Sequence, residues 1–296
     1  MTDRTTERAG GEGGRTREGG PIRVVLFYGP YLRSAHEFAL RLLAHPDIEL
    51  AAAYCAAPGE SRSHQLSDLW KRRGALGLAL FAFEVLRDAV RRVTSAEERA
   101  HRRRRAALAE RVRYVEDLHA PETLAEVRAL RPDLGLGYGG PILRPALFRI
   151  PRHGTLGIHH GRLPEYRGKK TTFWEIWEGE PTAGVTIQRI DEGIDTGEIV
   201  AQGSVPIAGR GYEAIWQDVQ RLGLELYVDA VLSVRDGSVV FRRAAGEKGP
   251  LRSDPTPWDL LRLPARRLRR VLRRRFRGGG GAARGEPGNR APEDPA

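Results

Sequence analysis

The sequence predicts an α/β fold built on a mostly parallel central sheet. The run Ile22–Tyr28 is almost continuously apolar and is closed by Gly29, which is typical of a strand buried on both faces of a parallel sheet. Apolar residues at helical spacing over Ser34–Ala44 and a second apolar run at Ile48–Tyr54 follow. A chain that opens as strand, helix and strand predicts a right-handed α/β layer.

The same alternation returns in the second half of the chain. Apolar and β-branched runs predict strands at Val112–Val115, Leu134–Tyr138, Gly154–Ile158, Gly184–Ile190 and Ile199–Ile207, with an edge strand at Val239–Arg242. Helical spacing predicts helices at Pro121–Leu130, Pro145–Phe148 and Tyr212–Val234, and a Trp-rich helix after Gly168. Between Pro58 and Ala109 the pattern predicts one or two inserted helices, whose arginine run is interpreted as a solvated face.

The composition divides the chain into one domain with polar ends. Residues 1–20 and 278–296 contain too few apolar side chains to offset their ordering entropy, so both segments are predicted to be disordered. The α/β domain is expected over residues 21–246, with the arginine-rich helical insert at 58–110. Residues 247–277 are expected to form a linker and a basic amphipathic helix.

The net charge of +11 is concentrated in that C-terminal helix. Nine arginines and no acidic residue lie between Arg262 and Arg277, whereas the rest of the chain is near neutral. Apolar residues alternate with these arginines from Trp258 onward, and Pro264 is expected to interrupt the helix. Three roles stay open for it: lying on an anionic membrane, contacting nucleic acid, or docking on the body.

Several classes of protein and site are excluded by simple observations. The single Cys55 rules out an internal disulfide, and it is interpreted as a small buried apolar residue. No apolar run reaches the roughly 20 residues that span a bilayer, and the N-terminus lacks an apolar signal core, so a cytoplasmic location is expected. The glycine spacing from Gly135 to Gly140 matches a dinucleotide fingerprint, but these glycines lie within a strand, so close approach of a ligand to the backbone is the better interpretation.

Two predicted strands point to one candidate site. The strand that begins at Gly154 ends on His159, and a later strand leads into a loop that carries Asp195. An imidazole beside a carboxylate can move protons at neutral pH. His160 is not expected to share a metal ion with His159, because neighbouring strand residues point to opposite faces.

The motifs around these two residues resemble a known family. The segments GTLGIHHGRLPEYRG, FWEIWEGE and GVTIQRIDEGIDTGEIV, followed by VPI, resemble the formyltetrahydrofolate-dependent formyltransferases. That family includes methionyl-tRNA, glycinamide ribonucleotide and sugar-nucleotide N-formyltransferases. The resemblance is dense from Gly154 to Ile207 and thinner back to Ile22, and it implies a Rossmann-like domain.

The resemblance also implies roles for particular residues. His159 and Asp195 match the family's catalytic histidine and aspartate. The formyl donor, N10-formyltetrahydrofolate, is expected along two loops, which comprise Tyr138, Gly139, Gly140, Pro141, Ile142 and Leu143, and Asp191, Glu192 and Gly193. An anionic group of the acceptor is expected at Arg167, Lys169, Lys170 and Thr171.

One position departs from the family pattern. Gly157 stands where the family has an asparagine, and the only Asn in the chain is Asn289 in the C-terminal tail. That asparagine would donate to the tetrahedral oxyanion of formyl transfer, and losing such a donor typically costs about 10² to 10³ in rate. Two explanations stay open. Another donor may replace it, with His160, Lys169, Lys170, Thr171 or a backbone amide as candidates, or formyl transfer has been lost or changed.

The acceptor expected from the resemblance is a small amine, such as an amino-sugar nucleotide or a natural-product intermediate. Methionyl-tRNA is not expected, because no second β-rich domain follows Gly246. The alternative function is that of a silent or altered relative, which binds folate or catalyses another one-carbon reaction. The sequence does not indicate an oligomeric state.

Overall fold

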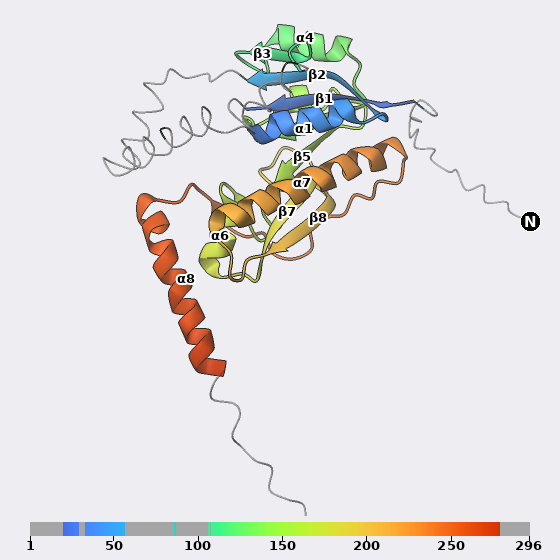
Figure 1. Cartoon of the computed structure of the whole chain (residues 1–296). Helices are drawn as coiled ribbons and strands as arrows, with labels where there is room; N and C mark the ends of the chain where they lie inside the picture. Colours follow the sequence, from blue (N-terminus) through green and yellow to red (C-terminus); the bar gives the residue numbers. More distant parts are fainter. Residues whose placement is uncertain (1–19, 30–32, 57–85, 87–105, 107, 279–296) are drawn as a thin grey trace, which may run out of the picture.

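A computed structural model describes residues 20–29, 33–56, 86, 106 and 108–278, with the side chains of residues 33 and 271–278 left undescribed. The expectations for residues 1–19, for nearly all of the 58–110 insert and for the tail after residue 278 lie outside the described residues. The predicted α/β fold is confirmed (Figure 1).

A seven-stranded mixed sheet in the order β3-β2-β1-β4-β5-β7-β8 forms the centre of the body. The strands of this sheet are β1 (Ile22–Tyr28), β2 (Ile48–Ala56), β3 (Val112–Val115), β4 (Leu134–Tyr138), β5 (Thr155–His159), β7 (Thr182–Arg189) and β8 (Ile199–Pro206). The first five strands in spatial order are parallel to one another. β7 runs antiparallel to β5, and β8 runs antiparallel to β7. A separate short parallel pair consists of β6 (Arg167–Gly168) and β9 (Leu251–Arg252).

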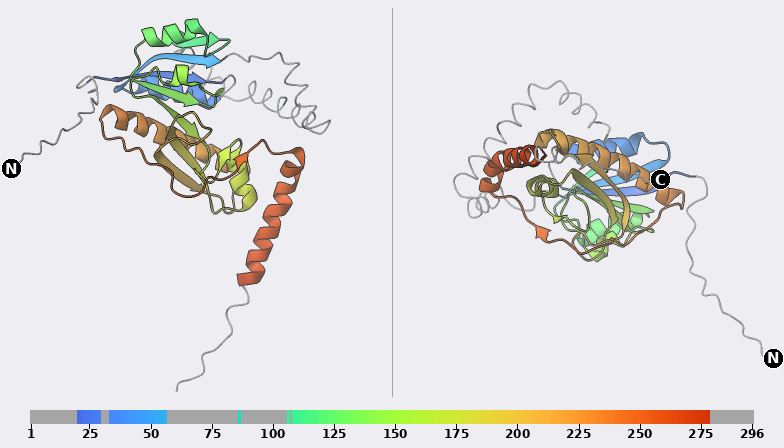
Figure 2. Two further views of the ribbon diagram at one scale, coloured as in Figure 1. Left: turned by 180° about the vertical axis from the view of Figure 1, so that it is seen from behind. Right: turned by 90° about the horizontal axis from the view of Figure 1, so that it is seen from below.

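Helices cover both faces of the sheet (Figures 1 and 2). They are α1 (Arg33–Ala44), α4 (Pro121–Ala129), α5 (Pro145–Phe148), α6 (Thr171–Glu178), α7 (Tyr212–Arg235) and α8 (Pro257–Gly278). Alternate residues of β1 separate two cores, since Leu26 packs with α1 and α7 whereas Phe27 packs with α4 and α5. The predicted burial of Cys55 is confirmed, at 3% exposure.

Glycines in β4 and β5 let the α5 side of the sheet pack closely. A Cβ added at Gly135 would lie 2.3 Å from Thr155 Oγ1, and one added at Gly137 would lie 3.0 Å from Ile190 Cδ1. A Cβ added at Gly29 would lie 2.6 Å from the carbonyl oxygen of Gly139, so the chain after β1 and the chain after β4 touch through their backbones. These glycines allow close packing within the protein, and the approach of a ligand to their backbone stays a prediction.

Three further expectations differ from the structure. Val239–Arg242 forms a single bridge to Ile199, because the chain passes β8 only at the first residue of that strand. Pro264 does not interrupt α8; the proline is exposed, so the carbonyl that loses its helical N–H partner is close to solvent. The segment expected to be a linker carries β9 and is bonded to the body.

Replacing Gly135 tests this packing. We expect Gly135→Val to lower the free energy of unfolding by about 1–3 kcal/mol, because its side chain overlaps Thr155 and Pro151. Chemical denaturation measures the change. The control Gly20→Ala should behave as wild type, since nothing lies within 4 Å of the added Cβ. Equal stability of the Gly135 variant and the control would contradict the packing.

Candidate active site

His159 and Asp195 meet at the end of β5, as the sequence predicts. His159 Nδ1 lies 3.3 Å from Asp195 Oδ1, with side-chain exposures of 7% and 16%. The other ring nitrogen, Nε2, lies 2.6 Å from the carbonyl oxygen of Tyr166. Each ring nitrogen therefore lies beside an oxygen that can accept an N–H, one from a carboxylate and one from the backbone.

Three donors from different segments surround the Asp195 carboxylate. Besides His159, the backbone N–H of Gly168 donates to Oδ2 at 2.8 Å and Gln188 Nε2 donates to Oδ1 at 3.0 Å. Burial pushes the pKa of Asp195 upward, but the contacts with His159, Gly168 and Gln188 outweigh it and hold the pKa below its ordinary value. Asp195 is therefore a fixed negative charge beside the imidazole at neutral pH.

Gln188 is a site residue that the sequence analysis missed. It is paired with Gly157 on the adjacent strand. Positions 157, 159, 188 and 190 therefore face the same side of the sheet. Gln188 Oε1 is buried without a hydrogen-bond partner in the described part of the chain. The alternation of side chains along β7 predicts that Gln188 and Ile190 share a face. Only the antiparallel register with β5 shows that this face carries His159.

Ile190 fills the space beside Gly157. A Cβ added at Gly157 would lie 3.1 Å from Ile190 Cγ1 and 3.2 Å from Cδ1, which is tighter than ordinary packing. An asparagine at this position would require Ile190 to shift. The absent side chain thus leaves an apolar surface beside the histidine.

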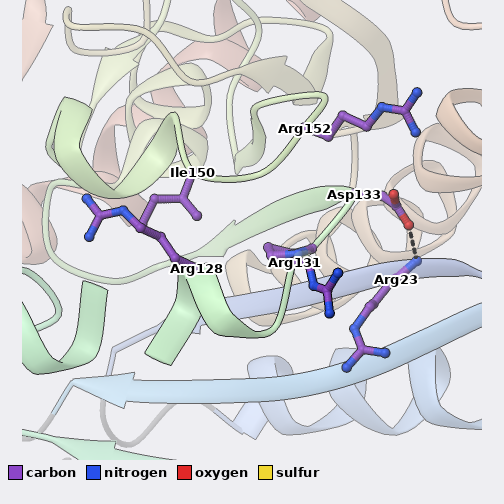
Figure 3. A pocket seen from close by; sticks show the side chains of 7 residues that line it. Arg23, Arg128, Arg131, Asp133, Ile150 and Arg152 are labelled. Atoms are coloured by element: carbon purple, nitrogen blue, oxygen red, sulfur yellow. Dashed lines mark hydrogen bonds between the residues drawn. The ribbon is translucent and has the colours of Figure 1, made fainter. Parts of the chain in front are cut away.

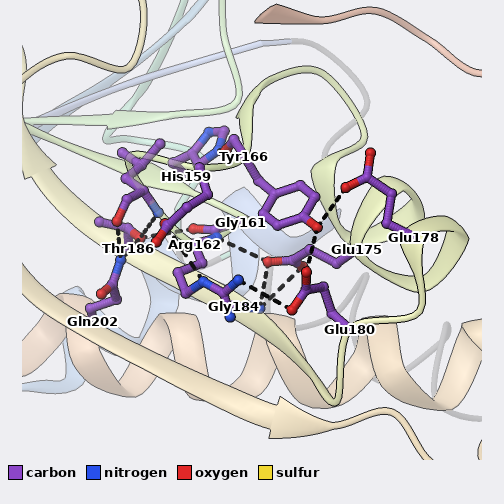
Figure 4. Close-up of polar contacts among 12 residues, drawn as sticks. His159, Gly161, Arg162, Tyr166, Glu175, Glu178, Glu180, Gly184, Thr186 and Gln202 are labelled. Atoms are coloured by element: carbon purple, nitrogen blue, oxygen red, sulfur yellow. Dashed lines mark hydrogen bonds and ion pairs between the residues drawn. The ribbon is translucent and has the colours of Figure 1, made fainter. Parts of the chain in front are cut away.

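A buried polar network holds the loop that carries the Tyr166 carbonyl (Figure 4). Glu175, which is 0% exposed, accepts from the backbone N–H groups of Arg162 and Gly184 at 3.0 Å each. The Tyr166 hydroxyl lies 2.8 Å from Glu178 and 2.9 Å from Glu180, and its one hydrogen can serve only one of them at a time. This network fixes the segment between β5 and α6 on the sheet.

The chain after α7 completes the same support. Gly249 N–H donates to the Pro164 carbonyl at 2.9 Å, and Lys169 N–H donates to the Arg252 carbonyl at 2.9 Å. The Arg252 side chain forms an ion pair with Glu178. Residues beyond the predicted domain end therefore brace the loop between β5 and α6.

The four predicted acceptor residues have different surroundings. The Arg167 guanidinium donates to the Ile194 carbonyl at 2.7 Å and so braces the Asp195 loop. Lys169 Nζ lies 3.7 Å from Asp254, and the buried Thr171 hydroxyl donates to the His160 carbonyl. Lys170 is exposed immediately before α6. Of the four, Lys170 is the one best placed to meet a substrate.

His160 lies on the other face of the sheet from His159. Its ring packs 4.9 Å from that of Trp216 and 6.1 Å from that of Tyr138, measured between centroids. Burial, followed by the nearby charge of His159, lowers the pKa of His160 to about 4. His160 is half-buried and lies on the opposite face of the strand from His159, so its ring is not directed to an oxyanion beside His159. Among the described residues, no group of three or more His, Cys, Asp or Glu side chains is placed to hold a metal ion.

The predicted folate loops are partly open. Tyr138 and Leu143 are core side chains, and the Tyr138 hydroxyl donates to Gln220 at 2.7 Å. Gly139, Gly140, Pro141 and Ile142 are exposed, with Ile142 at 73%. Asp191, Glu192 and Gly193 form an exposed turn, in which Asp191 accepts from the Gly193 N–H at 3.0 Å. The exposed backbone and the Ile142 side chain are thus open to a ligand, and folate binding along these loops stays a prediction.

A separate cavity of about 380 Å³ lies at the opposite, amino-terminal end of the parallel strands (Figure 3). It is lined by Arg23, Arg128, Arg131, Pro132, Asp133, Ile150 and Arg152. Ligands of open α/β sheets bind outside the carboxyl ends of the strands, which is where His159 lies. The cavity is therefore not part of the His159 site.

The pH dependence of stability tests the buried carboxyl group. Burial raises the pKa of Glu175 to about 7. Between about pH 4.5 and 7 the folded protein holds a proton that the unfolded chain has lost, so this group makes stability fall as pH rises, by up to about 3 kcal/mol. The lowered pKa of His160 acts with the opposite sign over much of this range.

Comparing wild type with Glu175→Gln isolates the contribution of Glu175. We expect the free energy of unfolding of wild type minus that of the variant to fall steadily from about pH 4.5 to 7, as measured by urea denaturation. A constant difference would show that folding does not raise the pKa of Glu175.

Comparison with known proteins identifies the fold and its relatives. A family model described as formyl transferase matches residues 88–231. Methionyl-tRNA formyltransferase of Citrifermentans bemidjiense is 36% identical over 122 residues, which cover 40% of this chain and 38% of that protein. The match thus spans less than half the length of this curated relative.

Solved structures share the fold at low identity. Glycinamide ribonucleotide transformylase 1 from Symbiobacterium toebii gives a TM-score of 0.53 at 17% identity, covering 79% of this chain and 99% of that one. A sugar N-formyltransferase from a Shewanella species gives 0.52 at 15% identity, covering 78% and 76%. These structures show the shared fold, and the family model and the curated relative confirm the resemblance to the formyltransferases.

Proposed function

We propose that this protein transfers a formyl group from N10-formyltetrahydrofolate to the amine of a small acceptor. The observation that carries the proposal is the His159–Asp195 pair, 3.3 Å apart at the carboxyl end of β5. In the reaction the amine nitrogen bonds to the formyl carbon, the bond from that carbon to N10 breaks, and one amine proton is transferred to N10. Charge develops on the formyl oxygen, so the site must supply positive charge or N–H donors there.

His159 supplies an N–H donor in this proposal. Its two ring nitrogens lie beside the Tyr166 carbonyl and the Asp195 carboxylate. To reach the substrate, the ring releases the Tyr166 carbonyl from Nε2 and directs this N–H to the formyl oxygen. Asp195 keeps the ring oriented during this change.

Gln188 supplies the second donor in this proposal. Its Nε2 has two hydrogens, of which one is directed to Asp195 Oδ1. The other hydrogen lies on the face that holds Gly157, opposite in register. Gln188 thus takes the role of the absent asparagine in this proposal.

The proposed acceptor is an amine that carries an anionic group, such as an amino-sugar nucleotide. Exposed Lys170 lies in the same loop that passes over the histidine, where it can meet a phosphate. The test incubates purified protein and N10-formyltetrahydrofolate with a panel of amino-sugar nucleotides, other small amines and methionyl-tRNA. Release of tetrahydrofolate and formation of a formamide are followed for each.

Substitutions at the three site residues give the next prediction. His159→Ala and Asp195→Asn should abolish measurable transfer, and Gln188→Leu should lower kcat by about 10² to 10³ because one oxyanion donor is removed. The matched control is Gln217→Leu, on the exposed face of α7, which should keep wild-type turnover. Unchanged kcat in the Gln188 variant would rule out the donor role.

Restoring the family asparagine separates a rebuilt site from an impaired one. With Gln188 acting as donor, Gly157→Asn should lower turnover several-fold, because the new side chain collides with Ile190. The companion variant Gly157→Asn with Ile190→Ala removes the collision and should not exceed wild type. Turnover above wild type in the double variant would show that the natural site lacks a donor.

A silent folate-binding relative is the second candidate. The apolar Ile190 surface beside Gly157 favours it, since a polar donor is missing at that point. Calorimetry that detects tight binding of the formyl donor, together with no transfer to any amine of the panel, would support this alternative.

A further inference from the structure

Helix α8 is attached to the body by arginines that bond to the end of α6. Arg266 Nε donates to the Trp177 carbonyl at 3.0 Å, and Arg270 donates to the carbonyls of Ile176 and Trp177. Arg267 donates to the Arg210 carbonyl, and Leu263, 8% exposed, joins the core cluster of α6 and α7. The last carbonyls of a helix lack helical N–H partners, so Arg266 and Arg270 satisfy the Trp177 carbonyl, whereas the Ile176 carbonyl also accepts the N–H of Gly179.

This attachment determines which face of α8 is free. On a helix, Leu263, Arg266, Arg267 and Arg270 occupy one side. Trp258, Leu261 and Leu268 fall on the opposite side, and their exposed fractions are 61%, 53% and 59%. The helix extends away from the α/β body (Figures 1 and 2). We call Trp258, Leu261 and Leu268 the apolar stripe.

The surroundings of the apolar stripe are strongly basic. Exposed Arg262 and Arg269 lie beside it, about two helical turns apart. Residues 257–278 contain nine arginines and one acidic residue, Asp259. An apolar strip edged by cations, with a tryptophan at one end, has the character of a helix that lies in a membrane interface.

We propose that the apolar stripe of α8 binds the surface of an anionic lipid bilayer. Trp258, Leu261 and Leu268 enter the boundary between headgroups and acyl chains, while Arg262 and Arg269 contact anionic headgroups. A second copy of this chain is disfavoured as the occupant, because two basic helices repel each other. RNA would use the arginines but leaves most of the leucine surface exposed to water.

The helix lies on the bilayer and does not cross it. No helix among the described residues is long and apolar enough to span a membrane. Membrane attachment of this kind is independent of the formyl-transfer proposal, because α8 contains none of the proposed catalytic residues.

The test uses the full-length protein and sedimentation with lipid vesicles. Wild type should bind vesicles of phosphatidylcholine with phosphatidylglycerol, and not vesicles of phosphatidylcholine alone. Binding should be accompanied by a blue shift of tryptophan fluorescence that is lost in Trp258→Ala. Leu261→Ser with Leu268→Ser, which keeps every charge, should bind the anionic vesicles at least about tenfold more weakly.

Two controls complete the design. Val240→Ser removes an equally exposed apolar residue outside α8, at 63% exposure, and should bind as wild type. Arg262→Gln with Arg269→Gln should also weaken binding, and more so at low salt, where the lost attraction is strongest.

Three outcomes would overturn the proposal. The first is no binding of wild type to anionic vesicles, and the second is undiminished binding by the leucine variant. The third is a dimer in sedimentation equilibrium that the leucine variant dissociates, which would show that a second copy covers the stripe. Binding to single-stranded RNA that is indifferent to the leucines, without vesicle binding, would assign the helix to nucleic acid.

Discussion

The carboxylate of Asp195 ties together the parts of the chain that form the site. Asp195 has a φ of +52°, a backbone conformation that costs an ordinary residue free energy, and the contacts of its side chain offset that cost. These contacts reach His159 at the end of β5, Gly168 in β6 and Gln188 in β7. The turn itself requires Gly197, since a Cβ there would lie 1.6 Å from the Arg189 carbonyl oxygen.

The opposite wall of the site depends on a second buried carboxyl group. Glu175 bonds the loop after β5 to β7, and the Tyr166 hydroxyl meets two further carboxylates from the end of α6 and the turn that follows. β9 then pairs with β6 from outside. The position of the Tyr166 carbonyl, and hence of the imidazole, thus depends on residues as far along the chain as Arg252. The helix α8 begins five residues later, so this support continues directly into α8.

The sequence predicted the sheet better than it predicted the contacts around it. Apolar runs such as Ile22–Tyr28 report burial directly, because both faces of a parallel strand are covered. His159 and Asp195 were predicted from sequence motifs, which can be recognised without knowing which strands pair. Gln188 could not be found in this way, since its role depends on the antiparallel register that places it across from Gly157. The β6–β9 pair was missed for the same reason: two residues carry no periodicity, and their partner is distant in the sequence.

The space beside Gly157 is not empty, because the Ile190 side chain occupies it. A Cβ added at either Gly137 or Gly157 would lie within 3.2 Å of the Ile190 side chain, so Ile190 occupies part of the space that an asparagine would need. Apolar atoms there lower the local dielectric and strengthen any remaining donor beside them. They also make an unsatisfied oxyanion more costly, so a site arranged like this functions only if another N–H is close. The unpartnered buried oxygen of Gln188 marks the one amide in the described site that is not fully used within the fold. In the proposed mechanism, Gln188 therefore provides the N–H that the residue at position 157 does not supply.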